Sequence, residues 1–131
     1  MSDIVVTTPK SEMKNAAEEA QQAIEAGGDT CYFRALASAP KGLVLGVSRI
    51  FYVEDGYVRG FGILDVAHND NYNFCETTGR HWFGRCTLVM RASTWQWVKS
   101  IPMKGFQGWR YFDQPFRVIG GWRDPKPNVH T

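Results

Sequence analysis

Hydrophobic and polar residues alternate with two different periods along the chain, and the period changes near Gly28. Ile4-Val5-Val6 is a β-branched run typical of a strand. Between residues 13 and 24, apolar side chains recur at helical spacing, with glutamate and glutamine on the opposite side. Thr8-Pro9 before this segment and Gly27-Gly28 after it are typical of helix ends. The pattern therefore predicts a short strand followed by one amphipathic helix with an alanine-rich buried face.

Beyond Gly28 the pattern predicts short strands separated by turns. The expected strands are Cys31–Leu36, Arg49–Val53, Tyr57–Val66, Phe83–Ala92, Tyr111–Phe112 and Phe116–Ile119, with a further apolar run at Leu43–Val47. The clearest element is a hairpin closed by Glu54-Asp55-Gly56, because Asp-Gly favours a tight turn with positive φ values. Gly60 and Gly62 interrupt its return strand, which indicates a bulge or the close approach of another backbone. Both strands of this hairpin are expected to be buried on more than one side, as in a strongly bent sheet.

Three segments are predicted to be irregular. Residues 67–81 are polar and lie between strands, so we expect a long surface loop there. Ser93–Val98 is predicted to form either a short helical turn or an irregular strand. Residues 124–131 contain two prolines and are expected to form a flexible C-terminal tail or an extended docked arm.

Length and composition favour a single α+β domain. The chain has 131 residues, of which 44% are hydrophobic, and this is enough for one core. One early helix followed by five to seven short strands is typical of a small β barrel, which we place over residues 1–123. The chain has no run of about 18 apolar residues, no segment resembling a secretory leader, and only three cysteines. We therefore expect a cytoplasmic protein that has no disulfide framework and does not enter a membrane.

The net charge of +2 conceals an acidic first segment and a basic remainder. Residues 1–30 carry six acids and two lysines, whereas residues 31–131 carry 13 basic and seven acidic side chains. This division predicts an acidic helix face on a mildly basic body. The body lacks the dense Lys/Arg patch of a strong non-specific DNA binder, so a local pocket is favoured over a long electrostatic track.

Motifs for metal binding and catalysis do not stand out. Cys75, His81 and Cys86 lie close together and follow His68, but they lack the closely spaced ligand pairs of a zinc knuckle. The sequence contains no nucleophile elbow, zinc-protease helix or phosphate-binding glycine loop. We therefore expect no metal and no cofactor, and we assign no catalytic residue.

The segment from Trp95 to Phe112 carries the strongest functional signal. Six of its 18 residues are aromatic, three are basic and none is acidic. Aromatic faces stack on nucleobases and cationic side chains attract phosphate, so this composition favours a ligand that contains a nucleobase. A small β domain also needs aromatic residues for its core, and each ring has that alternative role.

A glycine-bounded turn lies inside this segment. Gly105 and Gly108 allow the backbone to approach a ligand closely and to expose N–H groups. Gln107 offers a donor and an acceptor that can recognise a base edge, while Lys104 and Arg110 flank the turn. The alternative role of this turn is a tight connection between strands with an aromatic plug.

The early helix, the hairpin Arg49–Leu64 and the segment Gly105–Phe112 together resemble the PUA-like superfamily. These small pseudo-barrels include the ASCH and EVE/YTH groups, and the likeness covers about residues 4–120. The resemblance implies that RNA, modified bases or nucleotides bind in a cleft at the barrel mouth. The EVE/YTH groups imply an aromatic cage around a modified base, for which Trp97, Trp109 and Tyr111 are the candidate rings.

ASCH members are similar in carrying a GxKxxExR motif where the helix meets the first long strand. Gly27 and Arg34 fit this motif, but Asp29 replaces its lysine and Tyr32 replaces its glutamate. A ribonuclease that relies on the lysine and the acid would lose its charge stabiliser and its proton-transfer group. The resemblance therefore implies binding rather than catalysis, and it carries over Arg34.

Together these features predict a binding domain for RNA, DNA or a modified nucleotide that acts as a monomer or a homodimer. The expected ligand-binding residues are Arg34, Trp97, Lys104, Phe106, Gln107, Trp109, Arg110 and Tyr111. One alternative is an ASCH-like nuclease or small nucleotide hydrolase that uses Asp29, Glu54 or Asp65 with Lys104 near Arg34. Another is a protein-interaction domain in which exposed aromatic side chains form a dimer patch.

Overall fold

Nine strands and one short helix make up the part of the chain that a computed structural model describes, which is residues 2–7, 16–28, 30–36, 40–68, 72–75, 80–83 and 86–128. The helix is α1 (Ala16–Glu25). The strands are β1 (Ile4–Thr7), β2 (Thr30–Leu36), β3 (Arg49–Glu54), β4 (Tyr57–His68), β5 (Tyr72–Cys75), β6 (Arg80–Phe83), β7 (Cys86–Pro102), β8 (Trp109–Tyr111) and β9 (Val118–Gly121). The predicted β-rich domain with an early helix is therefore confirmed, and it has more strands than the five to seven expected.

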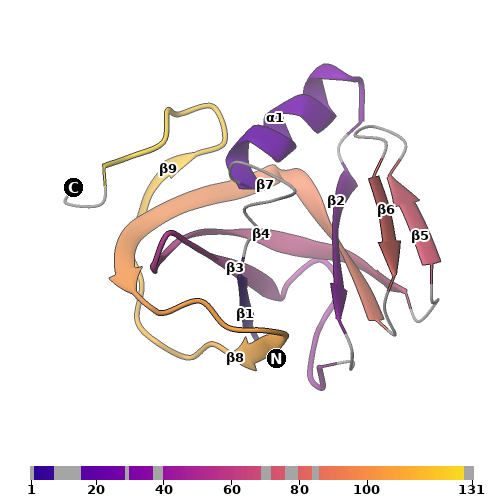
Figure 1. Cartoon of the computed structure of the whole chain (residues 1–131). Helices are drawn as coiled ribbons and strands as arrows, with labels where there is room; N and C mark the ends of the chain where they lie inside the picture. The colour runs from indigo at the N-terminus through magenta and orange to yellow at the C-terminus, as the bar shows by residue number, and fades with distance from the viewer. Residues whose placement is uncertain are drawn as a thin grey trace.

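Seven of these strands form one mixed sheet. Its order is β2-β7-β4-β3-β1-β8, and β9 also pairs with β7. β1 runs parallel to β3, whereas the other pairs in this sheet are antiparallel. β7 is 17 residues long and pairs in turn with β2, β4 and β9. This long strand arches across the molecule, and it gives the sheet its strong bend (Figure 1).

The β3–β4 hairpin forms as predicted. Asp55 and Gly56 at its tip have φ values of 52° and 84°, the positive values that the Asp-Gly pair favours. The β4–β7 register shifts between Val58 and Gly60, and the indole of Trp95 packs onto Gly60. Gly62 lies directly under the side chain of Met90. The predicted bulge is therefore confirmed, and the predicted close approach of another backbone is confirmed at Gly60, where the Gln96 carbonyl oxygen would lie 2.5 Å from a Cβ; Gly62 instead makes room for a side chain.

The bent sheet has a hydrophobic cluster on each face, because side chains alternate along its strands. The inner cluster, beneath α1, contains Ile4, Val6, Ala17, Ala20, Ala23, Leu36, Ile50, Tyr52, Leu64, Leu88, Met90, Ala92, Trp95 and Trp97. The outer cluster contains Val5, Phe51, Val53, Val58, Phe61, Val98 and Phe112, with Ile63, Ile101, Met103, Phe106 and Phe116 packed against it. The three alanines confirm the predicted small-residue face of the helix.

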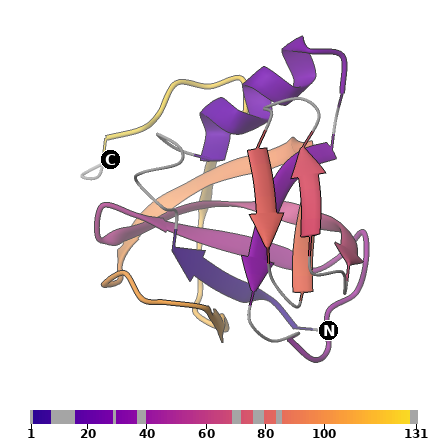
Figure 2. The ribbon, with the colours of Figure 1, turned by 45° about the vertical axis from the view of Figure 1, so that its right-hand side comes forward.

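Two predictions differ from the structure: the long loop at residues 67–81 and the further apolar run placed with the strands at Leu43–Val47. β4 continues to His68, and β5 and β6 form a two-stranded antiparallel sheet where a long loop was expected. In β5, Tyr72 and Phe74 alternate with Asn73 and Cys75, and this period favours a strand although the average composition is polar. β6 (Arg80-His81-Trp82-Phe83) has no such alternation. Figure 2 shows this small sheet next to β2. The apolar run Leu43–Val47 forms no strand: Leu43 packs against the inner cluster, while Val44, Leu45 and Val47 are exposed around a turn with φ of 78° at Gly46. Val44 N donates to Ser48 Oγ at 2.8 Å.

The remaining segments fit their predictions in part. Ser93–Val98 belongs to β7, so the irregular-strand alternative is confirmed, and the β4–β7 and β7–β9 registers both shift near it. Thr8-Pro9 and residues 129–131 lie outside the described residues. In the described ranges, no helix has the length and apolar character needed to cross a membrane.

Candidate ligand-binding site

The predicted glycine turn and the residues around it are fixed to the edge of the main sheet. β8 pairs antiparallel with β1, and three further hydrogen bonds from the backbone hold the flanking residues. These bonds join Met103 N to the Gly56 carbonyl (2.9 Å), Phe106 N to Thr7 Oγ1 (3.0 Å) and Phe112 N to the Asp3 carbonyl (3.0 Å). The predicted site residues between Met103 and Phe112 therefore have defined positions on the sheet.

Strand alternation divides these residues between the two faces. The Arg110 guanidinium carbon lies 4.2 Å from the ring centroid of Phe106, which packs against the outer cluster. Trp109 packs instead against the inner cluster, and its ring meets Tyr111 edge-on with centroids 4.9 Å apart. Tyr111 is 52% exposed, and its hydroxyl pairs with the backbone N and O of Lys41, both at 3.1 Å. The aromatic and basic residues of this segment therefore do not form one cage.

The side chains of Lys104 and Gln107 are exposed near the turn. Neither residue belongs to the lining of the two pockets described below. Their roles as phosphate and base contacts remain predictions.

Trp97 lies apart from the glycine turn. Its side chain is only 1% exposed, packs edge-on against Trp95 with ring centroids 5.3 Å apart, and donates from Nε1 to the Asp124 carbonyl at 3.3 Å. It also lines a pocket of about 200 Å³ beside α1, together with residues near the C-terminus. Trp97 is thus a core side chain that borders a small polar pocket.

The position of Arg34 is described only through its backbone. It lies on β2, opposite Leu88 of β7, and β2 and β8 are the two ends of the strand order given above. The side chain of Arg34 lies outside the described part of the chain. Its place in a site shared with the late aromatic residues remains a prediction.

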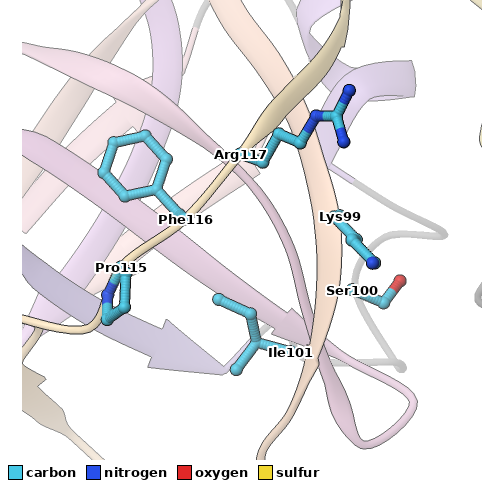
Figure 3. A pocket seen from close by; sticks show the side chains of 6 residues that line it. All are labelled: Lys99, Ser100, Ile101, Pro115, Phe116 and Arg117. Atoms are coloured by element: carbon cyan, nitrogen blue, oxygen red, sulfur yellow. The ribbon is translucent and has the colours of Figure 1, made fainter.

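The structure shows a pocket that the sequence did not predict. It has a volume of about 310 Å³ and lies between β7 and the segment that leads into β9. Its lining residues are Lys99, Ser100, Ile101, Pro115, Phe116 and Arg117. Figure 3 shows the charged ends of Lys99 and Arg117 on one side and the Phe116 ring, Pro115 and Ile101 on the other. The pocket therefore has a cationic half and an apolar half.

The pairing of β7 with β9 brings the two cations of this pocket, Lys99 and Arg117, together. Lys99 N donates to the Arg117 carbonyl at 2.8 Å, which extends the pairing of β7 with β9 by one step. Residues directly opposite each other across an antiparallel pair have neighbouring side chains. Both side chains are exposed, and none of the described side chains that line this pocket is acidic. An anionic group is therefore the ligand that this half favours.

Phe116 in the apolar half has a fixed orientation. Its ring lies edge-on to Phe51 and Phe61, with centroids 5.2 and 5.6 Å away. The guanidinium carbon of Arg49 lies 5.2 Å from the centroid of the Phe116 ring. Arg49 Nη1 forms an ion pair with Asp3 Oδ2 at 3.2 Å. A ring held on several sides presents its remaining surface without a large loss of side-chain entropy.

The outer cluster connects this pocket to the predicted segment. Ile101 and Phe116 of the pocket pack against this cluster, and so does Phe106, which carries Arg110 over its ring. We call Lys99, Phe106, Arg110, Phe116 and Arg117 the aromatic–basic surface. Of this surface, the sequence prediction included only Phe106 and Arg110 as site residues.

The acidic residues considered for catalysis have other partners. Glu54 is buried and its Oε2 lies 3.6 Å from Lys126 Nζ, while Asp65 forms an ion pair with Arg91 at 2.9 Å. Asp55 occupies the hairpin tip. Asp29 lies outside the described residues. No carboxylate therefore joins the lining of the 310 Å³ pocket in the described chain.

A metal site would need several His, Cys, Asp or Glu side chains close together in the described part of the chain. Within it, no three His, Cys, Asp or Glu side chains come together as a metal site. The side chains of His68, Cys75, His81 and Cys86 lie outside that part.

Comparison with known proteins does not assign this chain to a family. No protein-family model, curated protein or solved structure matches this chain.

Proposed function

We propose that this chain is a binding domain for a nucleobase-containing ligand, with its main contact in the 310 Å³ pocket. Lys99 and Arg117 hold a phosphate, and the Phe116 ring packs against the base or sugar. The observation that carries the proposal is the separation of two cations from an aromatic, apolar wall within one pocket (Figure 3).

The chemistry of the lining supports this ligand class. Arg117 offers a planar fork that matches phosphate oxygens in pairs, whereas Lys99 adds a compact point charge. Base–aromatic stacking contributes about 1–3 kcal/mol and tolerates every base, because each base has a π face. A volume of about 310 Å³ lies at the lower end of small-molecule sites and suits one nucleotide.

Neighbouring residues extend the proposal from a nucleotide to a single strand. Phe106 with Arg110 supplies a second ring and cation over the same outer cluster. Lys104 is exposed between the end of β7 and Phe106, and Gln107 is exposed between Phe106 and Arg110 in the chain. The proposed domain is a PUA-like pseudo-barrel, and the modified-base ligands of that superfamily belong in the panel tested.

The experiment is a fluorescence anisotropy titration with labelled single-stranded RNA and DNA, with nucleosides, modified nucleosides and nucleoside monophosphates as competitors. The double variant Lys99→Gln/Arg117→Gln is expected to weaken binding at least about tenfold, because two phosphate contacts are lost. Phe116→Leu is expected to weaken it by about 5- to 150-fold, the range that corresponds to one stacked base.

The matched control is Lys41→Gln/Arg123→Gln. It removes the same charge from two exposed side chains outside the pocket lining. The proposal is wrong if both double variants bind equally, or if no member of the panel binds the unaltered protein.

A further inference from the structure

The last described residues form a strap that passes one end of α1 and runs along the edge of the protein (Figures 1 and 2). We use the word strap for Trp122–Pro127. Three side chains from different elements donate hydrogen bonds to its backbone carbonyls. Gln21 Nε2 donates to the Trp122 carbonyl oxygen (2.7 Å), and Trp97 Nε1 donates to the Asp124 carbonyl oxygen (3.3 Å). Arg59 Nη2 donates to the Pro127 carbonyl oxygen. The protein therefore holds the strap mainly by its backbone.

The strap contributes little to the core. Residues 123–126 are exposed, and among the described residues neither hydrophobic cluster includes a residue beyond Trp122. One side-chain contact adds sequence preference, because Lys126 Nζ lies 3.6 Å from Glu54 Oε2. Backbone acceptors combined with one specific side-chain contact are typical of the way proteins bind extended peptides.

The side chains of Arg59 and Glu54, which contact the strap, are largely buried. Arg59 is 4% exposed, its guanidinium carbon lies 5.9 Å from the Trp97 ring centroid, and the Glu54 side chain is 3% exposed. Burial lowers the pKa of Arg59, and the negative charges of Glu54 and Asp55 act in the opposite direction. A buried cation needs hydrogen-bond acceptors, and a strap carbonyl supplies one.

The strap begins with a turn, in which Asp124 N donates to the Gly121 carbonyl at 3.0 Å, and Pro125–Pro127 follows as an irregular segment. Pro125 and Pro127 flank Lys126, and Pro125 lines the 200 Å³ pocket together with Trp97 and Gln21. Proline fixes φ before binding, which reduces the conformational entropy lost when an extended chain is ordered. A separate peptide with the same sequence would therefore be expected to bind at the place that the strap occupies.

We propose that Gln21, Glu54, Arg59 and Trp97 form a recognition groove for an extended peptide that carries a lysine between two prolines. The chain's own strap is the resident ligand of this groove, and an identical segment supplied by a second copy exchanges with it. This groove lies over the inner cluster, so the inference does not depend on nucleotide binding at the Lys99–Arg117 pocket.

The test measures the anisotropy of a fluorescein-labelled peptide with the sequence of residues 120–131, titrated with full-length protein. In the unaltered protein the strap competes at an effective concentration of roughly millimolar. Lys126→Glu places a like charge beside Glu54 and weakens the strap, while the groove keeps its residues. We expect this variant to bind the peptide at least about tenfold more tightly than the unaltered protein does.

A charge exchange makes the test specific. A peptide carrying Lys126→Glu should bind the Lys126→Glu protein at least about tenfold more weakly than the unaltered peptide does, whereas a Glu54→Lys protein should prefer the altered peptide. The matched control is Arg123→Glu, the same charge change at an exposed strap residue whose guanidinium lies over Trp122, 4.9 Å from the ring centroid. This control should bind like the unaltered protein.

Two results would overturn the proposal. One is equal peptide affinity for the Lys126→Glu, Arg123→Glu and unaltered proteins. The other is that the Lys126→Glu protein, or the Glu54→Lys protein, binds the unaltered peptide and the Lys126→Glu peptide with equal affinity. Should Lys126→Glu unfold at the assay temperature, Lys126→Ala replaces it, and binding no tighter than that of the unaltered protein again overturns the proposal.

Discussion

The Arg110 guanidinium and the Phe106 ring form a cation–π pair on the outer face of the sheet, with 4.2 Å between guanidinium carbon and ring centroid. Trp109 and Tyr111 lie next to Arg110 in sequence, but Trp109 packs against the inner cluster. A strand places successive side chains on opposite faces, so one short strand divides a sequence that looks like a single aromatic–basic motif.

This division predicts unequal effects of substitution on nucleic-acid binding. Phe106→Leu and Arg110→Gln should each weaken single-strand binding by about 5- to 20-fold, because both residues lie on the aromatic–basic surface. Tyr111→Phe should leave binding unchanged and lower thermal stability slightly, since it removes the hydroxyl that pairs with the Lys41 backbone. Anisotropy and thermal unfolding measure the two effects. Equal loss of binding in all three variants would contradict the division.

The salt dependence of binding should report the two pocket cations. Each phosphate contact on a single strand contributes about −0.7 to the slope of log K against log salt concentration. Lys99→Gln/Arg117→Gln should therefore make the slope less negative by about 1.4. Titrations at four salt concentrations measure the slope. An unchanged slope would mean that neither cation contacts phosphate.

Gly60→Ala should destabilise the protein. A Cβ at this position would lie 2.5 Å from the Trp95 ring and from the Gln96 carbonyl oxygen, and neither can move without disturbing β7. We expect a loss of about 1–3 kcal/mol in the free energy of unfolding, measured in urea. The control is Gly121→Ala, where the nearest atom, Asp124 Oδ2, would be 3.9 Å away. Its free energy of unfolding should stay within about 0.5 kcal/mol of the unaltered protein.

Asp3→Ala should destabilise the contact between the start of β1 and the start of β3. Asp3 Oδ1 accepts from Arg49 N at 2.7 Å, and Oδ2 pairs with the Arg49 guanidinium at 3.2 Å. Loss of the acceptor for the backbone N–H should cost about 1–3 kcal/mol in the free energy of unfolding. Asp3→Asn keeps an acceptor oxygen and should lose less. Urea unfolding of both variants gives the order, and equal losses would show that the charge alone matters.

The elements that were predicted correctly from the sequence are those that depend on residues close together in the chain. The Asp55-Gly56 turn and the alanine face of α1 follow from local conformational preference and helical spacing, and both appear as expected. The late strand was placed at Tyr111–Phe112, whereas β8 is Trp109–Tyr111. Period-two alternation across that strand was the signal that could have shown the division between faces.

The sequence could not predict the pocket at Lys99 and Arg117. Each half of the pocket combines a residue of β7 with residues of the segment that leads into β9, and the two segments meet through the pairing of β7 with β9. Hydrophobic periodicity shows which face of a strand is buried, but it does not name the partner strand. The adjacent Phe116-Arg117 pair was the one local sign of an aromatic–basic site there.

The place of β1 in the sheet has a consequence for how the chain folds. β1 lies between β3 and β8, so the first strand of the chain pairs with residues 50–53 on one side and with residues 109–111 on the other. Pairings this distant in sequence require large loops to close, which slows folding relative to proteins of local contacts. During synthesis the N-terminal strand has an unpaired edge until Trp109–Tyr111 has left the ribosome. The nascent chain therefore carries an exposed β-branched edge, a surface that chaperones and other nascent chains can bind.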